Sequence, residues 1–140
     1  MMGEIRIKLN LENDGDLFLH RQGKIEAEAI RRLAIDAMVD TGAVMLLLPQ
    51  DAVEILGLER VGRVIVTLAN EQKIELDVGA TLSVTACDRT MKTDCLIGPP
   101  RCEPLVGQIL LERLDLLLDP VRRRISPRPE SPYLPSLKLK

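Results

Sequence analysis

Aromatic residues are almost absent from this chain of 140 residues, which has no tryptophan and only Phe18 and Tyr133 as aromatics. Because the many hydrophobic residues are chiefly Leu, Ile, Val and Ala, we expect an aliphatic core. The shortage argues against binding of single-stranded nucleic acid, which usually relies on aromatic stacking. The net charge of -2 gives no global basic field for nucleic acid or anionic lipid. The run Arg122, Arg123 and Arg124 is a local exception, typical of a solvated turn.

Histidine and cysteine are scarce too. The three cysteines, Cys87, Cys95 and Cys102, form no CxxC pair, and the single histidine, His20, lies far upstream. This spacing argues against a zinc site, and we expect neither a metal nor a cofactor. An odd number of cysteines without a leader segment fits a reducing compartment better than a disulfide scaffold.

Long hydrophobic runs are missing as well. Glu4, Arg6 and Lys8 interrupt the apolar residues of the N-terminal segment, which therefore has no signal-peptide core. No stretch reaches the roughly 18 apolar residues of a membrane span. We therefore expect a cytoplasmic protein with no membrane partner.

What is present reads mostly as short strands. Polar and apolar residues alternate over residues 4–11 and 33–39, which is typical of half-buried strands. Between them we expect a turn at residues 13–16 and a strand at 17–19. Residues 25–30 could form another strand, with a helix over 24–33 as the alternative.

The second half of the chain continues this pattern. Residues 44–48 are uniformly apolar and predict a strand buried on both faces, and a helix from Pro49 would end at Gly57. The further predicted elements are a hairpin of 63–68 and 73–78, a hairpin of 82–87 and 90–97, a strand at 105–107, a helix at 108–114 and a strand at 116–118. This series indicates an all-β domain of barrel or sandwich type with one or two short helices. We place the domain at residues 1–125 and a proline-rich tail without regular packing at 126–140.

The segment Asp40-Thr41-Gly42-Ala43 has the clearest chemical potential. One apolar strand leads into it and another leaves it. A carboxylate between two buried strands costs free energy unless it is paired or functional. The glycine permits a sharp turn, and the Thr41 hydroxyl can hydrogen-bond to fix the loop. The alternative for the tripeptide alone is that Asp40 merely caps a turn, as Asp-x-Gly sequences often do.

Four segments in this order resemble the retropepsin-like aspartic proteases, the retroviral type and its bacterial single-domain relatives. Residues 37–43 look like the family's apolar strand ending in Asp-Thr-Gly-Ala. Leu105-Val106-Gly107 and the short helix after it are similar to the second signature, which threads beside the catalytic loop. The hairpin 63–78 stands where the family has its flap over the substrate, and residues 114–120 look like the closing strand of bacterial members.

The resemblance implies a closed, barrel-like acid-protease fold and aspartic endopeptidase activity on a polypeptide substrate. It assigns catalysis to Asp40, the active-site loop to Thr41, Gly42 and Ala43, and substrate contacts to Leu68, Ala69, Asn70, Gly107 and Gln108.

Aspartic protease chemistry needs two Asp side chains that share one proton and activate a water between them. This chain has one Asp-Thr-Gly, since Asp77-Val78-Gly79 lacks the threonine and lies on the second strand of the hairpin. We therefore expect a homodimer in which each chain donates Asp40 across a two-fold axis. In the family, terminal strands of both subunits interleave, and residues 5–9 and 116–118 could do so here.

Two alternatives remain open. One is a catalytically inactive relative that keeps the fold as a binding or dimerisation module, because fold alone does not separate the two. Retention of Asp40, Thr41 and Gly42 together favours the enzyme. The other is a phosphoryl-transfer site, which would need a parallel α/β sheet and a phosphate-binding loop that the sequence does not contain.

The chain departs from the retroviral pattern at several positions. Val44 and Gln108 stand where retroviral members have an acidic residue and an arginine that form an ion pair, so both partners are absent together. The turn 69–72 lacks the glycines of the viral flap tip. Met45 and Leu46 replace small or hydroxylated residues, and we expect them to narrow the pocket.

Overall fold

The two alternating segments form the first two strands of the sheet. In the computed structural model, which describes residues 4–139, β1 (Arg6–Asn13) buries Ile7, Leu9 and Leu11 on one face. It pairs antiparallel with β2 (Arg32–Val39) along seven residues. The further elements are α1 (Asp14–Arg21), the 3-10 helix η1 (Ala27–Ala29), β3 (Leu47–Pro49), α2 (Gln50–Leu56), β4 (Glu59–Thr67), β5 (Lys73–Ala86), β6 (Arg89–Gly98), β7 (Leu105–Val106), α3 (Gln108–Arg113), β8 (Leu116–Asp119) and β9 (Arg124–Pro127).

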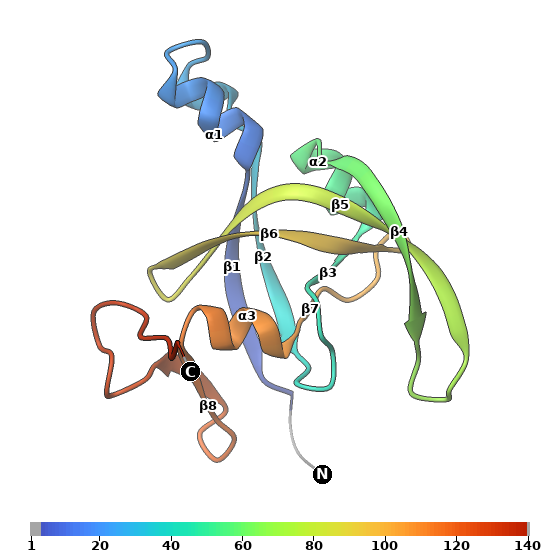
Figure 1. Ribbon diagram of the computed structural model, residues 1–140, viewed down its shortest axis with the longest axis vertical. Helices are drawn as coiled ribbons and strands as arrows, with labels where there is room; N and C mark the ends of the chain where they lie inside the picture. The colour runs from blue at the N-terminus through green and yellow to red at the C-terminus, as the bar shows by residue number, and fades with distance from the viewer. Residues whose placement is uncertain (1–3, 140) are drawn as a thin grey trace.

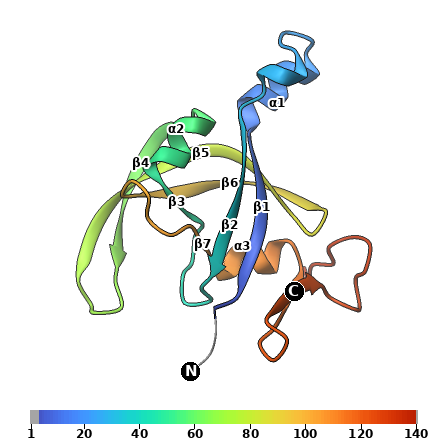
Figure 2. The same ribbon diagram turned by 180° about the vertical axis from the view of Figure 1, so that it is seen from behind.

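Seven strands form one sheet in the order β1-β2-β7-β3-β6-β5-β4. Because β1 also pairs with β5, the strands from β1 to β5 in this order close into a ring of six. Strand β4 lies outside the ring and pairs with β5. In Figure 1, β5 and β6 run across the direction of β1 and β2. Seen from behind, α1 projects at one end of the molecule and the β4–β5 hairpin at one side (Figure 2). The prediction of a mostly β structure is confirmed, although residues 4–139 contain three short α-helices where we expected one or two.

The core is aliphatic, as predicted. Its largest fully buried side chains are Leu, Val and Cys95, whereas Phe18 and Tyr133 are exposed. Helix α2 buries Ala52, Val53 and Leu56 against it, and the helix ends at Gly57, whose φ of 63° is left-handed. Glycine adopts that conformation without a Cβ penalty, so the sequence located this helix end correctly.

Strand β5 is longer than the sequence predicted. The segments 73–78 and 82–87 were expected to belong to separate hairpins, but they lie in one strand with a register shift between Gly79 and Leu82. The first part of β5 pairs with β4 and the last part pairs with β1. A bulge lets one strand bend from one side of the ring to the other, which periodicity alone does not reveal.

The predictions for residues 13–19 and 24–31 are wrong. Residues 14–21 form helix α1 rather than a turn and a strand. Residues 24–31 contain the short 3-10 helix η1, where we expected a strand at 25–30 or a helix over 24–33. The Asn13 side chain caps the helix by accepting the Asp16 N–H at 3.0 Å. Asp16 in turn binds the backbone N–H and guanidinium of Arg31, which draws the following loop back toward α1. The cap signal was present in the sequence, but the contact between Asp16 and Arg31 is tertiary.

The strand expected at residues 44–48 is confined to β3, Leu47–Pro49. Val44 is largely exposed rather than buried on both faces, whereas Leu46 is buried in the core. Residues 43–46 instead complete the loop that begins at Asp40.

Strand β9 pairs with β8 in a two-stranded sheet outside the ring. Regular structure therefore continues through Ser126 and Pro127, where we expected none. A proline is tolerated at the end of an edge strand because its missing N–H costs no ladder hydrogen bond there.

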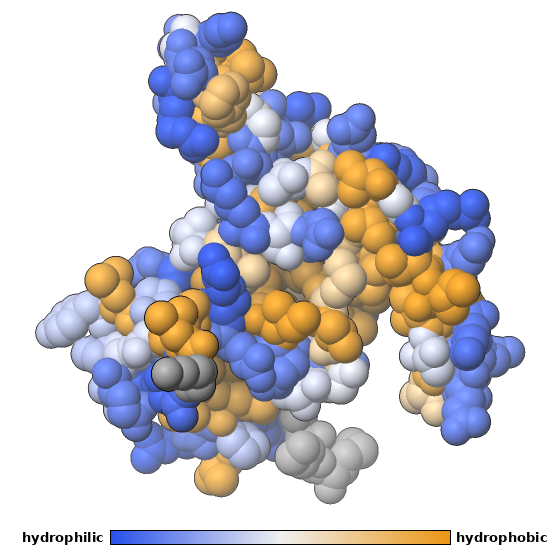
Figure 3. All heavy atoms as spheres, viewed as in Figure 1, coloured by the Kyte–Doolittle hydropathy of each residue, from blue (hydrophilic) through white to orange (hydrophobic). Residues whose placement is uncertain are grey.

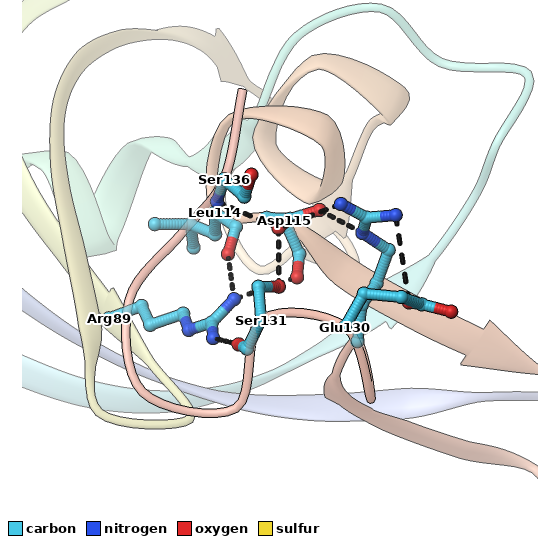
Figure 4. A network of polar contacts seen from close by, with 7 residues as sticks. Arg89, Leu114, Asp115, Glu130, Ser131 and Ser136 are labelled. Atoms are coloured by element: carbon cyan, nitrogen blue, oxygen red, sulfur yellow. Dashed lines mark hydrogen bonds and ion pairs between the residues drawn. The ribbon is translucent and has the colours of Figure 1, made fainter. Parts of the chain in front are cut away.

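A buried polar network holds the chain that follows β9 (Figure 4). The Arg89 guanidinium, from β6, donates to the backbone oxygens of Leu114 and Asp115 at 3.0 and 2.8 Å, and also to the Ser131 carbonyl. The Asp115 carboxylate accepts the Ser131 hydroxyl at 2.5 Å and the guanidinium of Arg128. Residues up to Ser131 are thus attached to the ring through side chains, although Pro127 and Pro129 fall between Ser126 and Ser131.

Candidate active site

The Asp40 loop begins where β2 ends and is fixed by its own backbone and by β7. The Asp40 N–H donates to the Val106 carbonyl at 2.9 Å, continuing the parallel pairing of Val39 with Val106. The Ala43 N–H donates to the Asp40 carbonyl at 3.0 Å, and the Gly42 N–H donates to Asp40 Oδ1 at 3.0 Å. Asp40 is half-buried. The loop therefore holds one carboxylate oxygen against its own backbone.

Thr41 was expected to fix this loop through its hydroxyl. The structure places it in an exposed position, and the contact across the turn joins Asp40 Oδ1 to Gly42 instead.

Gly107 packs directly against the Asp40 loop. A Cβ at Gly107 would lie 2.6 Å from the Ala43 carbonyl oxygen and 2.8 Å from the carbonyl of Val44, closer than real Cβ contacts. The Gln108 N–H donates to the same Ala43 oxygen at 3.0 Å. Residues 105–108, singled out as a second signature, therefore lie beside the loop that bears Asp40.

Neither Gly107 nor Gln108 lines the groove described next. Gly107 is buried, and the Gln108 side chain donates to Glu112 Oε1 at 3.0 Å on the following turn of α3. In this subunit both residues contact the Asp40 loop, and their contact with substrate stays a prediction.

A groove of about 860 Å³ runs between the Asp40 loop and the β4–β5 hairpin. We call it the Asp40 groove. It is lined by Asp40, Gly42, Ala43, Val44, Met45 and Leu47, by residues 64–69, Ile74 and Leu76 of the hairpin, and by Leu96, Gly98, Pro99 and Leu105. Among its lining residues, all within the described part of the chain, Asp40 is the only ionisable one.

Two of the predicted substrate contacts, Leu68 and Ala69, line the groove, and a third, Asn70, does not. Asn70 lies in the exposed hairpin tip, where its Oδ1 accepts the Gln72 N–H at 3.0 Å. Leu68 and Gln72 also pair through a backbone hydrogen bond of 2.8 Å. The tip is therefore a closed turn without glycine, in which Glu71 takes a positive φ of 67°.

Most of the lining residues on β4 were not predicted. Val64, Ile65 and Val66 form an apolar run on this strand, and Ile65 is 68% exposed. An apolar run on a predicted two-stranded hairpin is the signal that could have identified them. Met45, expected to narrow the pocket, does line the groove, whereas Leu46 does not.

The second Asp-x-Gly has a structural role. Asp77 on β5 accepts Arg60 Nε at 2.9 Å, and Arg63 Nε lies 3.7 Å from its other oxygen. Arg63 also contacts Glu75 at 2.6 Å, which completes a row of ion pairs across the hairpin. In contrast, no Lys, Arg or His among residues 4–139 lies within ion-pair distance of Asp40. Asp77 is therefore paired with two arginines, whereas Asp40 has no cation within ion-pair distance in the described part of the chain.

The cysteines do not offer an alternative nucleophile. Burial raises the pKa of Cys95 to about 12, and burial is also the main cause of the raised pKa values of Cys87 and Cys102. A thiol with a raised pKa is protonated at neutral pH and is a poor nucleophile.

Within residues 4–139, no group of three or more His, Cys, Asp or Glu side chains is placed to hold a metal ion. No helix in this part of the chain has the length and apolar character needed to cross a bilayer.

Comparison of the chain with protein-family models and with curated proteins finds no match.

Proposed function

We propose that this chain is one subunit of a homodimeric aspartic endopeptidase in which Asp40 of each subunit contributes half of the catalytic dyad. The observation that carries the proposal is that Asp40 is the sole ionisable lining residue of a large apolar groove. A carboxylate at an apolar wall, with no cation in ion-pair contact among residues 4–139, is the kind of group that enzymes use for proton transfer.

The arrangement of the four resembling segments supports an acid-protease fold. The Leu105-Val106-Gly107 segment packs against the Asp40 loop, and the β4–β5 hairpin lines the other side of the groove, which supports the resemblance. A ring of paired strands carries all three. The closing strand β8 differs, since it pairs with β9 of its own chain.

The dyad follows from the count of available carboxylates. Asp77 is held by Arg60 and Arg63, so a second Asp40 must come from another copy. Two carboxylates a few ångströms apart cannot both ionise cheaply, so the pair holds one shared proton. The ionised member removes a proton from a water, whose oxygen attacks the peptide carbonyl carbon while the protonated member donates to the carbonyl oxygen. Transfer of a proton to the amide nitrogen then releases the amine as the C–N bond breaks.

The substrate of this site is an extended polypeptide with apolar side chains. The groove offers aliphatic surface from the hairpin and the Asp40 loop, and no cation lines it. Leu68 and Ala69 place the hairpin tip on one wall, so the hairpin can cover a bound peptide.

The first prediction is that Asp40→Asn abolishes peptide cleavage and leaves the fold intact, because an Asn pair can neither share a proton nor act as a base. The wild type and the variant are incubated with a library of unstructured peptides across pH, and products are identified by mass spectrometry. Asp77→Asn serves as the matched carboxylate control and should retain cleavage. Equal turnover by the Asp40→Asn variant would rule out the proposed chemistry.

A catalytically inactive binding module is the second candidate, and one contact favours it. Asp40 Oδ1 already accepts the Gly42 N–H, which is what a purely turn-capping aspartate does. The same library separates the two candidates. Peptides retained by the wild type at every pH without cleavage would identify a module, and cleavage that depends on Asp40 identifies the enzyme.

A further inference from the structure

Positive charge is concentrated at the C-terminal end of this acidic chain. Residues 120–140 contain six Lys or Arg and one Glu, a net charge of +5, whereas the whole chain has a net charge of -2. Residues 1–119 therefore carry a net charge of -7. Such an asymmetry gives one end of the molecule a positive field that the total charge conceals.

The turn between β8 and β9 is the densest part of this region. It presents Arg122, Arg123 and Arg124 in succession, all exposed. Its one acidic residue, Asp119, accepts the backbone N–H groups of Val121 and Arg122, both at 3.1 Å. The nearest guanidinium nitrogen, Arg122 Nε, is 3.9 Å from Asp119, and the Arg122 side chain remains 74% exposed. No ion pair within residues 4–139 involves Arg123 or Arg124, so the turn keeps a high density of solvated cations.

Apolar side chains are exposed in the same C-terminal part of the chain as these cations. Val121 in the same turn is 90% exposed. Tyr133, Leu134, Leu137 and Leu139 are exposed on the following chain. Figure 3 shows hydrophobic residues interspersed with hydrophilic ones over this end of the molecule. Large aliphatic groups that meet only water are costly, so their exposure in the same part of the chain as the cations favours a partner that accepts both.

The segment is not a free tail, because the Arg89 and Asp115 network attaches it to the ring (Figure 4). Asp115 also accepts the backbone N–H of Ser136 at 2.8 Å, three residues before Leu139. The turn is likewise set by the pairing of β8 with β9. The cations and the apolar side chains are thus held on one module of the protein.

We propose that the β8–β9 turn and residues 133–139 form a docking surface for an anionic lipid bilayer. Cations attract the headgroups while adjacent aliphatic and aromatic side chains enter the interface, which is the combination that peripheral membrane anchors use. Single-stranded nucleic acid would use the cations but usually needs stacking platforms, and Tyr133 is the only aromatic residue in this segment. An acidic protein segment would leave the aliphatic side chains in water. The contact is peripheral and requires no membrane span. We expected no membrane partner from the net charge of the whole chain, but that total differs in sign from the charge of the C-terminal segment.

The test is co-sedimentation of the full chain with vesicles of phosphatidylcholine alone or with about 30% phosphatidylserine. We expect binding to the anionic vesicles only, weakened by salt because the Debye length shortens. Each cation near an anionic surface changes partitioning roughly fivefold, so the variant Arg122→Gln/Arg123→Gln/Arg124→Gln should bind about a hundredfold more weakly. Val121→Asn, which leaves the charge unchanged, should also weaken binding, whereas a purely electrostatic partner would bind this variant as it binds the wild type.

The matched control is Lys8→Gln/Arg21→Gln/Lys24→Gln, which removes the same charge from exposed residues at other places and should bind as the wild type does. Equal loss in both triple variants, or equal binding to the neutral vesicles, would overturn the proposal. So would binding of a DNA oligonucleotide or a polyglutamate peptide by the wild type without binding to anionic vesicles. Circular dichroism of each variant confirms that the fold is retained.

Discussion

Gly107 is the residue whose missing side chain sets the position of Asp40. The Ala43 and Val44 carbonyl groups occupy the space that a Cβ would need. Since these contacts are to backbone atoms, relief requires movement of the loop rather than of a flexible side chain.

Gly107→Ala is therefore expected to lower the free energy of unfolding by about 1–3 kcal/mol, as overpacking does. The proposed peptidase activity should fall by a larger factor than stability alone explains, because small displacements of a catalytic group are costly. Urea unfolding and peptide cleavage measure the two effects. Gly62→Ala is the control, since nothing lies within 4 Å of its added Cβ, and it should be near neutral. Equal activity in the two variants would contradict this role of Gly107.

Asp115 is the residue at the centre of the C-terminal network. Hydrogen bonds from Arg128, Ser131 and the Ser136 N–H hold the pKa of its carboxyl far below the usual range. A carboxyl with a lower pKa in the folded state stabilises the fold above its unfolded pKa of about 3.9, and this contribution is lost as pH falls through the folded pKa.

We expect Asp115→Asn to unfold at a lower temperature than the wild type at pH 7, with the difference between the two shrinking as the pH is lowered below about 4. Asn also tolerates the positive φ of 55° found at this position, so the variant tests the charge rather than the backbone. Calorimetry from pH 7 to pH 2 measures the difference. A difference that stays constant over this range would show that the ionised carboxylate is not what the network requires.

At the scale of elements, the β4–β5 hairpin is the part of the structure suited to movement. Eight of the nine residues of β4 are exposed, and its only sheet partner is β5. Ion pairs of Arg60 and Arg63 with Asp77 and Glu75 join the two strands below the tip. Few buried contacts mark a segment of low local stability.

The amides of Leu68 to Gln72 should exchange quickly in the free protein and slowly when a statine-type peptide is bound. The bound peptide would contact Leu68 and Ala69 on the groove wall and hold the tip against it. Hydrogen exchange with and without the peptide measures this change. The β8–β9 turn, which does not line the groove, provides control amides that should not change. Unaltered exchange at the tip, at a peptide concentration shown to saturate binding, would argue against a covering role.

At the scale of the whole molecule, the proposed chemistry requires two chains. We expect specific activity to fall on dilution together with the dimer fraction, because each subunit supplies one Asp40 and none of the other residues that line its groove is ionisable. Sedimentation and peptide cleavage are measured over the same concentration series. Full specific activity in a species that sediments as a monomer would exclude a shared site.

Some features of this protein were determined by local sequence. Alternation over β1 and β2, the left-handed position at Gly57 and the aliphatic composition predicted the strands, a helix end and the core correctly, because each depends on neighbouring residues or on composition alone. The sequence also predicted that residues 105–108 lie beside the Asp40 loop, because both segments resemble motifs that are neighbours in the family.

Only the tertiary structure decided the rest. The ion pair of Asp16 with Arg31 fixes the loop that follows α1. The bulge in β5 makes one strand of two segments that were predicted as separate strands. The hydrogen bond from Arg89 to Ser131 joins the C-terminal segment to a buried polar network. The Asp40 groove likewise exists because β4, distant in sequence from Asp40, lies opposite its loop. These contacts join residues that are far apart along the chain, and their free energy depends on burial and geometry that no local pattern of residues encodes.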